Sequence, residues 1–178
     1  PLMLALATSV AGLMVGCNDK EGFNNSSDAD SKAETALAED QSITINNTAE
    51  PESIDPHKVS AVPEGNIIRQ LFIGLVDTDR EGKTVPGMAE SWESKDNKVW
   101  TFKLRDAKWS NGDPVTAEDF VYSWQRLVDP NTASPYASYL VDAKVSGAEA
   151  VMAGEANPET LGIKALDNKT LQITLTEP

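Results

Sequence analysis

Alternation of apolar and polar side chains predicts a series of strands after residue 40. The most regular case is residues 99–105, which place Trp100, Phe102 and Leu104 on one face. Five segments have this strand-like character and are bounded by turn residues: 42–47, 89–93, 99–105, 161–166 and 170–176. The last two flank the turn at 167–169, so we expect them to form a hairpin.

Apolar residues at helical spacing predict helices between these strands. A stripe within residues 67–75 predicts a short amphipathic helix that ends near Gly74. Thr116 and Asp119 predict a capping box at the start of a second helix, whose apolar stripe lies within 120–128 and which stops at the Pro that follows. Two more segments are expected to be helical at least in part: 133–140, an aromatic loop or short helix, and 147–154. The expected class is mixed α+β.

The N-terminal residues are typical of an export signal. Residues 2–15 are apolar and uncharged, but they are shorter than the about twenty residues that span a bilayer. The sequence LMVGC at 13–17 resembles the lipobox of bacterial lipoproteins, with Met14 where Leu is commonest, and predicts lipidation at Cys17. Several acyl chains on one cysteine anchor a protein firmly. We therefore interpret residues 1–17 as a truncated lipoprotein signal peptide; the alternative is a buried cysteine at the end of a core helix.

Residues 18–40 are polar and acidic, and they contain too little apolar surface to offset the cost of ordering. This composition predicts a flexible acidic tether between the anchor and the folded part of the chain. The chain begins without Met and ends directly after a strand-like segment, so we expect it to be a fragment of a longer protein.

Charge and the counts of cysteine and histidine exclude several functions. The chain has 15 basic and 28 acidic residues, a net charge of −13, which repels phosphate backbones and makes nucleic-acid binding unfavourable. With one Cys and one His it cannot form an internal disulfide, and a His/Cys metal site would need more of both. The EF-hand spacing is also absent. We expect no metal and no cofactor.

No catalytic signature is present, since the chain lacks the nucleophile-elbow, zinc-protease, phosphate-loop and dinucleotide motifs. A catalytic role for His57 would pair it with Asp55 and a serine, but the adjacent Pro56 favours a structural role. Packing in the core is the expectation for Trp100 and Trp124, and Trp109 is left open. We predict no catalytic residues and no enzyme activity.

Several longer segments resemble one family of transport proteins. They are EPESIDPH at 50–57, LFIGL at 71–75, PGMAESW at 86–92, the run from WTFKLR to TAEDFVYSWQR within 100–126, and DPNTASPYASYL at 129–140. Together they resemble the peptide/nickel class of ABC-transporter solute-binding proteins, closest to the periplasmic oligopeptide-binding proteins. The resemblance covers residues 44–178.

The resemblance implies a two-lobe fold of the periplasmic-binding-protein type II kind, of which this chain is the N-terminal portion. Residues 41–72 would start the first main lobe, and residues 73–178 would form most of the accessory domain that distinguishes the class. The second lobe, which contributes much of the ligand cleft, would lie outside the chain.

The same resemblance implies three ligand-binding residues. Residues 59–63 match a cleft-lining segment in which the backbone of Val62 pairs with an extended peptide, and Tyr136 matches an aromatic cleft residue. Ser60 occupies a position that is acidic in some members, where it lies near the peptide amino terminus. Main-chain pairing, as in strand addition, accepts varied peptides.

The implied function is extracytoplasmic capture of oligopeptides and delivery to the permease of an ABC importer, by a monomer anchored as a lipoprotein in the periplasm or at the cell surface. One alternative is a binding protein for murein peptides or another solute of this class. Two alternatives from other classes are a surface interaction lipoprotein, which would bind partners without peptides, and a lipoprotein hydrolase.

Overall fold

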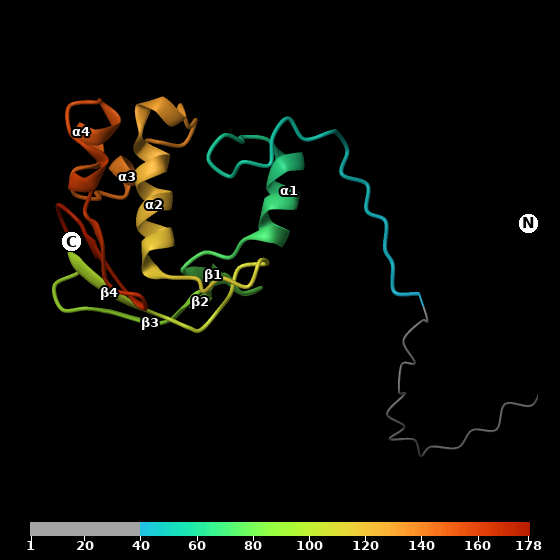
Figure 1. The fold of residues 1–178 in the computed structure, drawn as a ribbon, viewed down its shortest axis with the longest axis horizontal. Helices are drawn as coiled ribbons and strands as arrows, with labels where there is room; N and C mark the ends of the chain where they lie inside the picture. The colour runs from blue at the N-terminus through green and yellow to red at the C-terminus, as the bar shows by residue number, and fades with distance from the viewer. Residues whose placement is uncertain (1–39) are drawn as a thin grey trace, which may run out of the picture. The chain divides into compact units, whose positions relative to one another are not determined.

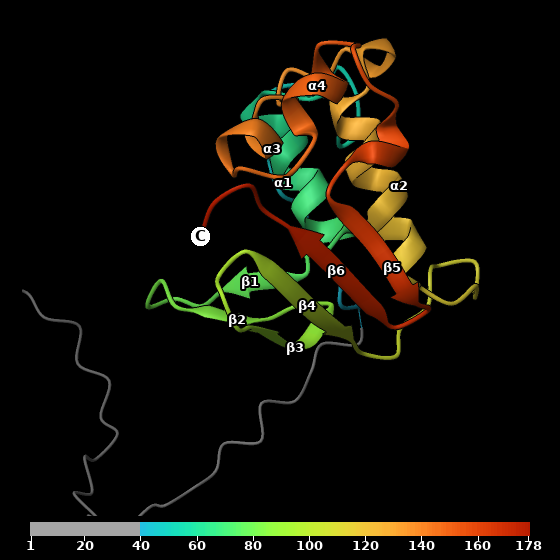
Figure 2. The same ribbon diagram turned by 90° about the vertical axis from the view of Figure 1, so that its left-hand side faces the viewer.

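The computed structural model describes residues 40–178 (Figures 1 and 2). All the helices and strands of this range lie in one compact unit, Thr44–Pro178. The predicted signal peptide, the tether and Cys17 lie outside the described residues. Among residues 40–178 no helix has both the length and the apolar character needed to cross a membrane.

Antiparallel sheets form the base of the unit. The larger sheet has the strand order β3-β4-β6-β5, and a separate pair, β1 and β2, lies beside it (Figure 2). The bounds of the strands are β1 Val76–Thr78, β2 Thr84–Pro86, β3 Ala89–Ser94, β4 Val99–Leu104, β5 Ile163–Asp167 and β6 Thr170–Thr174. The predicted strands at 89–93 and 99–105 and the predicted hairpin are confirmed. The hairpin strand β6 pairs with β4 in the middle of the sheet, so that Leu171 lies opposite Phe102.

Helix α2 (Ala117–Val128) packs against the strand β5 and forms the other layer of the core (Figure 1). Its start is fixed as predicted, because the Asp119 carboxylate accepts hydrogen bonds from the backbone N–H of Thr116 at 2.7 Å and from its hydroxyl at 3.1 Å. Its stripe buries Val121 and Val128, with Trp124 partly buried beside them. The buried core residues are Ala89, Leu104, Ala117, Val121, Val128, Leu140, Val145, Ala148, Val151, Leu161, Ile163, Leu171 and Ile173.

Helix α1 (Val62–Leu71) corrects the predicted bounds. It begins five residues before 67 and ends before Gly74, with Phe72 already extended. Pro63 does not break it, because a proline in the first turn has no hydrogen bond to lose. The remaining helical segments are short: 3-10 helix Pro130–Thr132, α3 Tyr139–Asp142, α4 Ala148–Met152 and 3-10 helix Pro158–Thr160.

The strand predicted at 42–47 is wrong for the described residues. This segment has no strand pairing, and Ile43 is 83% exposed. A strand is stabilised by hydrogen bonds to a neighbour, and alternation alone does not supply one. Residues 42–47 therefore alternate as a strand does but have no neighbouring strand to pair with among the described residues.

Candidate functional site

An exposed, extended segment precedes helix α1. Ser60, Ala61 and Val62 are all exposed, and Ala61 has the extended conformation φ −107°, ψ 161°. Val62 is 73% exposed, although it is the first residue of the helix. The N–H groups of a helix's first turn have no carbonyl partner within the helix. This segment therefore presents main-chain groups at the surface.

Tyr136 lies against this segment although 76 residues separate it from Ser60 in the sequence. Its hydroxyl donates to the carbonyl of Ser60 at 3.4 Å, and its ring stacks on Tyr139 with centroids 5.2 Å apart and planes at 22°. The structure thus brings Tyr136 to the segment that carries the other two predicted ligand residues, Ser60 and Val62. Sequence reasoning did not identify Tyr139, which lies three residues further along.

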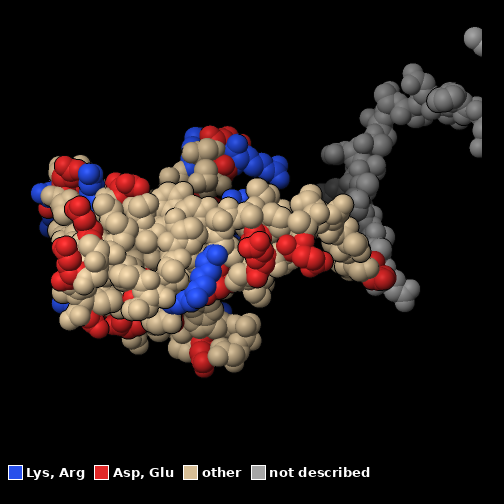
Figure 3. Space-filling model, turned by 90° about the horizontal axis from the view of Figure 1, so that it is seen from above, with Lys and Arg blue, Asp and Glu red and all other residues tan. Residues whose placement is uncertain are grey.

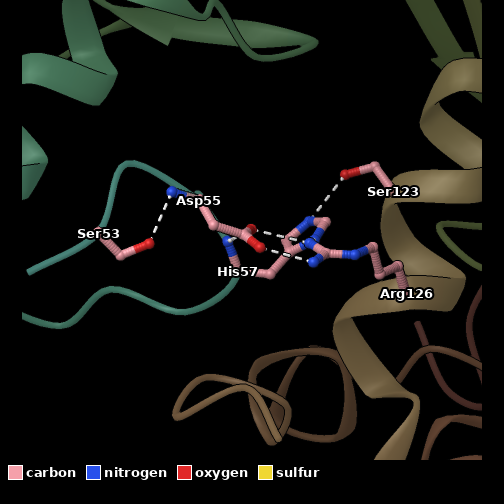
Figure 4. Close-up of polar contacts among 5 residues, drawn as sticks. All are labelled: Ser53, Asp55, His57, Ser123 and Arg126. Carbon is pink, nitrogen blue, oxygen red and sulfur yellow. Dashed lines mark hydrogen bonds and ion pairs between the residues drawn. The ribbon is translucent and has the colours of Figure 1, made fainter. Parts of the chain in front are cut away.

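A network of polar side chains joins the preceding loop to helix α2 (Figure 4). The guanidinium of Arg126 donates to both carboxylate oxygens of Asp55, at 2.8 and 2.6 Å. The Nη1 group of Arg126 also lies 2.6 Å from Nδ1 of His57, and the other ring nitrogen, Nε2, lies 3.1 Å from Oγ of Ser123. The backbone N–H of Asp55 donates to the hydroxyl of Ser53 at 3.0 Å. Four side chains thereby connect the loop and the helix.

The hydrogen bonds fix the tautomer of His57. Because a guanidinium only donates, Nδ1 of His57 must be the acceptor, and Nε2 carries the proton that points to Ser123. In a Ser-His-Asp triad the imidazole accepts from serine and donates to the carboxylate. Here the polarity is reversed and Asp55 pairs with Arg126, so this group of residues is not a catalytic triad.

The charges of the network follow from its geometry. Hydrogen bonding from Arg126 holds the pKa of Asp55 far below its usual range. Burial, followed by the adjacent positive charge of Arg126, lowers the pKa of His57. The pKa of Arg126 is raised, chiefly by its hydrogen bonds to Asp55. At neutral pH the network is thus an ion pair with a neutral imidazole.

Glu64 contacts the same loop nearer its start, at Glu52. Its side chain is buried, with the residue 4% exposed, and Oε1 accepts from the backbone N–H of Glu52 at 3.0 Å. That hydrogen bond is the main cause that lowers the pKa of Glu64. Within residues 40–178 the other oxygen, Oε2, has no hydrogen-bond partner. Sequence reasoning could not identify this role, since an acid in a helix's first turn is already explained by the helix dipole.

Three of the tryptophans differ in their surroundings. Trp100 and Trp124 pack against the core as predicted. Trp109 is exposed and meets Phe72 edge-on, with ring centroids 6.5 Å apart.

In the face shown in Figure 3 the acidic side chains are spread out, with basic ones among them. No group of three or more potential metal ligands occurs in the part of the chain that the structure describes.

Comparison with known proteins places the chain in a family. The family described as "Bacterial extracellular solute-binding proteins, family 5 Middle" matches residues 83–178. The periplasmic oligopeptide-binding protein OppA of Escherichia coli K12 is 53% identical over 98% of this chain, and the periplasmic murein peptide-binding protein MppA of the same organism is 51% identical over 81%. The chain spans 31% and 27% of the lengths of these relatives.

Solved structures agree with this relationship. The crystal structure of Haemophilus influenzae OppA in complex with RPPGFSPFR matches with a TM-score of 0.75 and 56% identity, over 80% of this chain and 28% of that chain. The Escherichia coli murein tripeptide binding protein MppA matches with a TM-score of 0.71 and 53% identity, over 72% and 26%. The mixed α+β class and the type II binding-protein fold, of which this chain is a portion, are therefore confirmed. The chain belongs to the family 5 bacterial extracellular solute-binding proteins.

Proposed function

We propose that this chain is the N-terminal portion of an extracytoplasmic protein that captures oligopeptides and delivers them to an ABC importer. Residues 41–72 would start its first main lobe, and residues 73–178 would form most of an accessory domain. The rest of the longer protein would supply the second lobe. Closure of the two lobes would shift an existing open–closed equilibrium, and the permease would bind the closed form.

The exposed backbone of the segment Ser60–Val62, with the Tyr136 ring beside it, carries this proposal. An extended main chain can pair with a peptide as an added strand does, without reading side chains. The Tyr136 hydroxyl donates to the Ser60 carbonyl, so the aromatic ring lies beside this segment, which supports a role for it in peptide binding. The solved relative that holds RPPGFSPFR supports a peptide as the ligand.

Binding of murein peptides is the second candidate. The Escherichia coli murein tripeptide binding protein MppA matches the fold with a TM-score of 0.71. Ser60 is neutral and gives no preference between the two ligands. A catalytic role is not proposed, because His57 donates to Ser123 and has no free ring nitrogen to act as a base.

The test is isothermal titration of the full-length protein with a library of tri- to pentapeptides and, separately, with a murein tripeptide. We expect micromolar or tighter binding to library peptides and a higher unfolding temperature in their presence, because a ligand of the native state stabilises it. Tighter binding of the murein tripeptide than of every library member would favour the second candidate. Binding of neither would refute both, and would favour a surface interaction lipoprotein.

We also propose that the protein is a monomer anchored by a lipid on Cys17, in the periplasm or at the cell surface. Support comes from the apolar residues 2–15, the lipobox-like sequence and the polar residues 18–40. Several relatives are periplasmic by name.

A further inference from the structure

The loop that leads into the segment Ser60–Val62 is held at several points. Glu64 accepts from Glu52 near its start, and Tyr136 donates to the carbonyl of Ser60 at its end. Between these contacts, Asp55 and His57 both contact one side chain of α2, Arg126. The conformation of the exposed segment therefore depends on contacts outside it.

We propose that Arg126 is a positioning residue for peptide recognition. By holding Asp55 and His57 together, Arg126 fixes the backbone that continues into the segment Ser60–Val62 and so preorganises the main-chain groups that meet the peptide. This inference rests on the proposed function. It assigns to Arg126 an indirect role, without contact to the peptide.

Arg126 is anchored well enough for this role. It lies in the last turn of α2, whose neighbouring residues Val121 and Val128 are buried in the core. Its fork makes two hydrogen bonds to one carboxylate, a geometry that a single-point cation cannot reproduce. The guanidinium is therefore a rigid reference point for a loop that has no regular secondary structure.

Asp55 connects the Arg126 side chain to the loop backbone through two hydrogen bonds. Its Oδ1 accepts from the N–H of His57 at 3.1 Å, and its carbonyl accepts from the N–H of Lys58 at 3.0 Å. Pro56 lies between Asp55 and His57 and restricts the backbone further. Once the carboxylate of Asp55 is fixed, the turn through Lys58 is fixed as well, two residues before Ser60.

A purely structural role is the competing explanation. The Asp55 and Arg126 side chains are each 28% exposed, and partly solvated ion pairs contribute little to global stability. Preorganisation has a different effect, because a segment that must order when the peptide binds lowers affinity directly. The two explanations therefore differ in whether affinity changes more than stability.

The experiment compares Arg126→Gln with a control, Arg80→Gln, in the full-length protein. Both remove one positive charge, but Arg80 is exposed in the turn between β1 and β2 and makes no hydrogen bond or ion pair within residues 40–178. The probe is trialanine, whose small side chains leave the main chain as the principal contact. Titration calorimetry measures the Kd for trialanine at a temperature well below the unfolding transition. Hydrogen exchange measures the exchange rates of the backbone amides of residues 58–62.

We expect Arg126→Gln to raise the Kd for trialanine about tenfold and to speed amide exchange in residues 58–62 without bound peptide, because the ordering cost moves to the binding step. Arg80→Gln should stay within about twofold, as expected of an exposed charge without partners. Arg126→Lys should be intermediate, since an ammonium can pair with Asp55 at one point only. A Kd for Arg126→Gln equal to that of the wild type would overturn the inference, whatever the exchange rates.

Two further outcomes are decisive. If Arg126→Gln does not fold, Asp55→Asn replaces it and must raise the Kd by a similar factor, since it removes the charge that orients the guanidinium; an unchanged Kd would refute the positioning role. If the wild type binds neither trialanine nor any library peptide, the proposed function fails, and the inference fails with it. Normal wild-type binding with no effect of either variant would refute the inference alone.

Discussion

Truncation of Tyr136 tests whether the stacked rings of Tyr136 and Tyr139 beside Ser60 contribute to peptide binding. The ring stacks on Tyr139 at 5.2 Å, and such pairs contribute about 0.5–1.5 kcal/mol beyond buried area. The hydroxyl donates to the Ser60 carbonyl at 3.4 Å, which is long, so its bond belongs at the low end of the usual range, about 0.5 kcal/mol. The ring should therefore matter more than the hydroxyl.

These magnitudes separate two variants. Tyr136→Phe keeps the stack and should raise the Kd for trialanine about twofold, since about 1.4 kcal/mol corresponds to a factor of ten. Tyr136→Ala loses both contacts, which order the segment before the peptide binds; because that order must then be supplied on binding, the Kd should rise about tenfold by the same conversion. The assay is titration calorimetry on the full-length protein, with the circular dichroism spectrum as a control for folding.

The ranking of the variants decides the outcome. If Tyr136→Ala binds trialanine within about twofold of the wild type, the ring is not part of the site, because that change is below the worth of the stack alone. If Tyr136→Phe is as damaging as Tyr136→Ala, the hydroxyl dominates, and the weight given to the long hydrogen bond is wrong.

Three further predictions concern stability and location. Burial and Arg126 lower the pKa of His57 from 6.5, so below pH 6.5 the unfolded chain binds more protons than the folded one. The free energy of unfolding therefore falls as the pH drops through the folded pKa. Denaturant titrations from pH 8 to pH 5 should show this fall, and His57→Gln should reduce it. Leu171 is fully buried, so Leu171→Ala should destabilise by about 2–5 kcal/mol in denaturant unfolding, whereas Leu166→Ala, at an exposed position of β5, should cost less than about 1 kcal/mol; equal losses would contradict the described core. Cys17→Ser should release the protein from the membrane fraction, and unchanged membrane association in that variant would end the lipoprotein assignment.

Local patterns predicted the elements whose causes are local. The stripe on α2, the capping by Asp119 and the stop at Asp129 and Pro130 all depend on residues within one helix, and each is found as expected. The start of α1 was missed because its first turn carries no apolar stripe. The strand at 42–47 failed for a different reason, since pairing depends on a partner that alternation does not reveal.

The polar contacts of the site were beyond sequence patterns because they join distant residues. Arg126 and Asp55 are 71 positions apart, and the place of Arg126 in a helix's last turn already has a local explanation in the helix dipole. The three ligand residues came from family resemblance, and no composition or spacing indicated them. Burial of Glu64 likewise becomes visible only once Glu52 is placed against the start of α1.

Breadth and affinity place opposite demands on a carrier of varied peptides. Reading the main chain gives breadth, but it forgoes the side-chain contacts that usually supply affinity. A rigid recognition segment offsets part of this loss, because a segment ordered before binding does not have to be ordered by the peptide. Glu64 and Arg126 make their contacts outside the segment Ser60–Val62, and Tyr136 hydrogen-bonds to it only at the Ser60 carbonyl. On this reasoning, weakening any of the three contacts should lower affinity for all peptides by a similar factor and leave their ranking unchanged. A variant at Arg126 that reordered the library would show instead that this residue reads side chains.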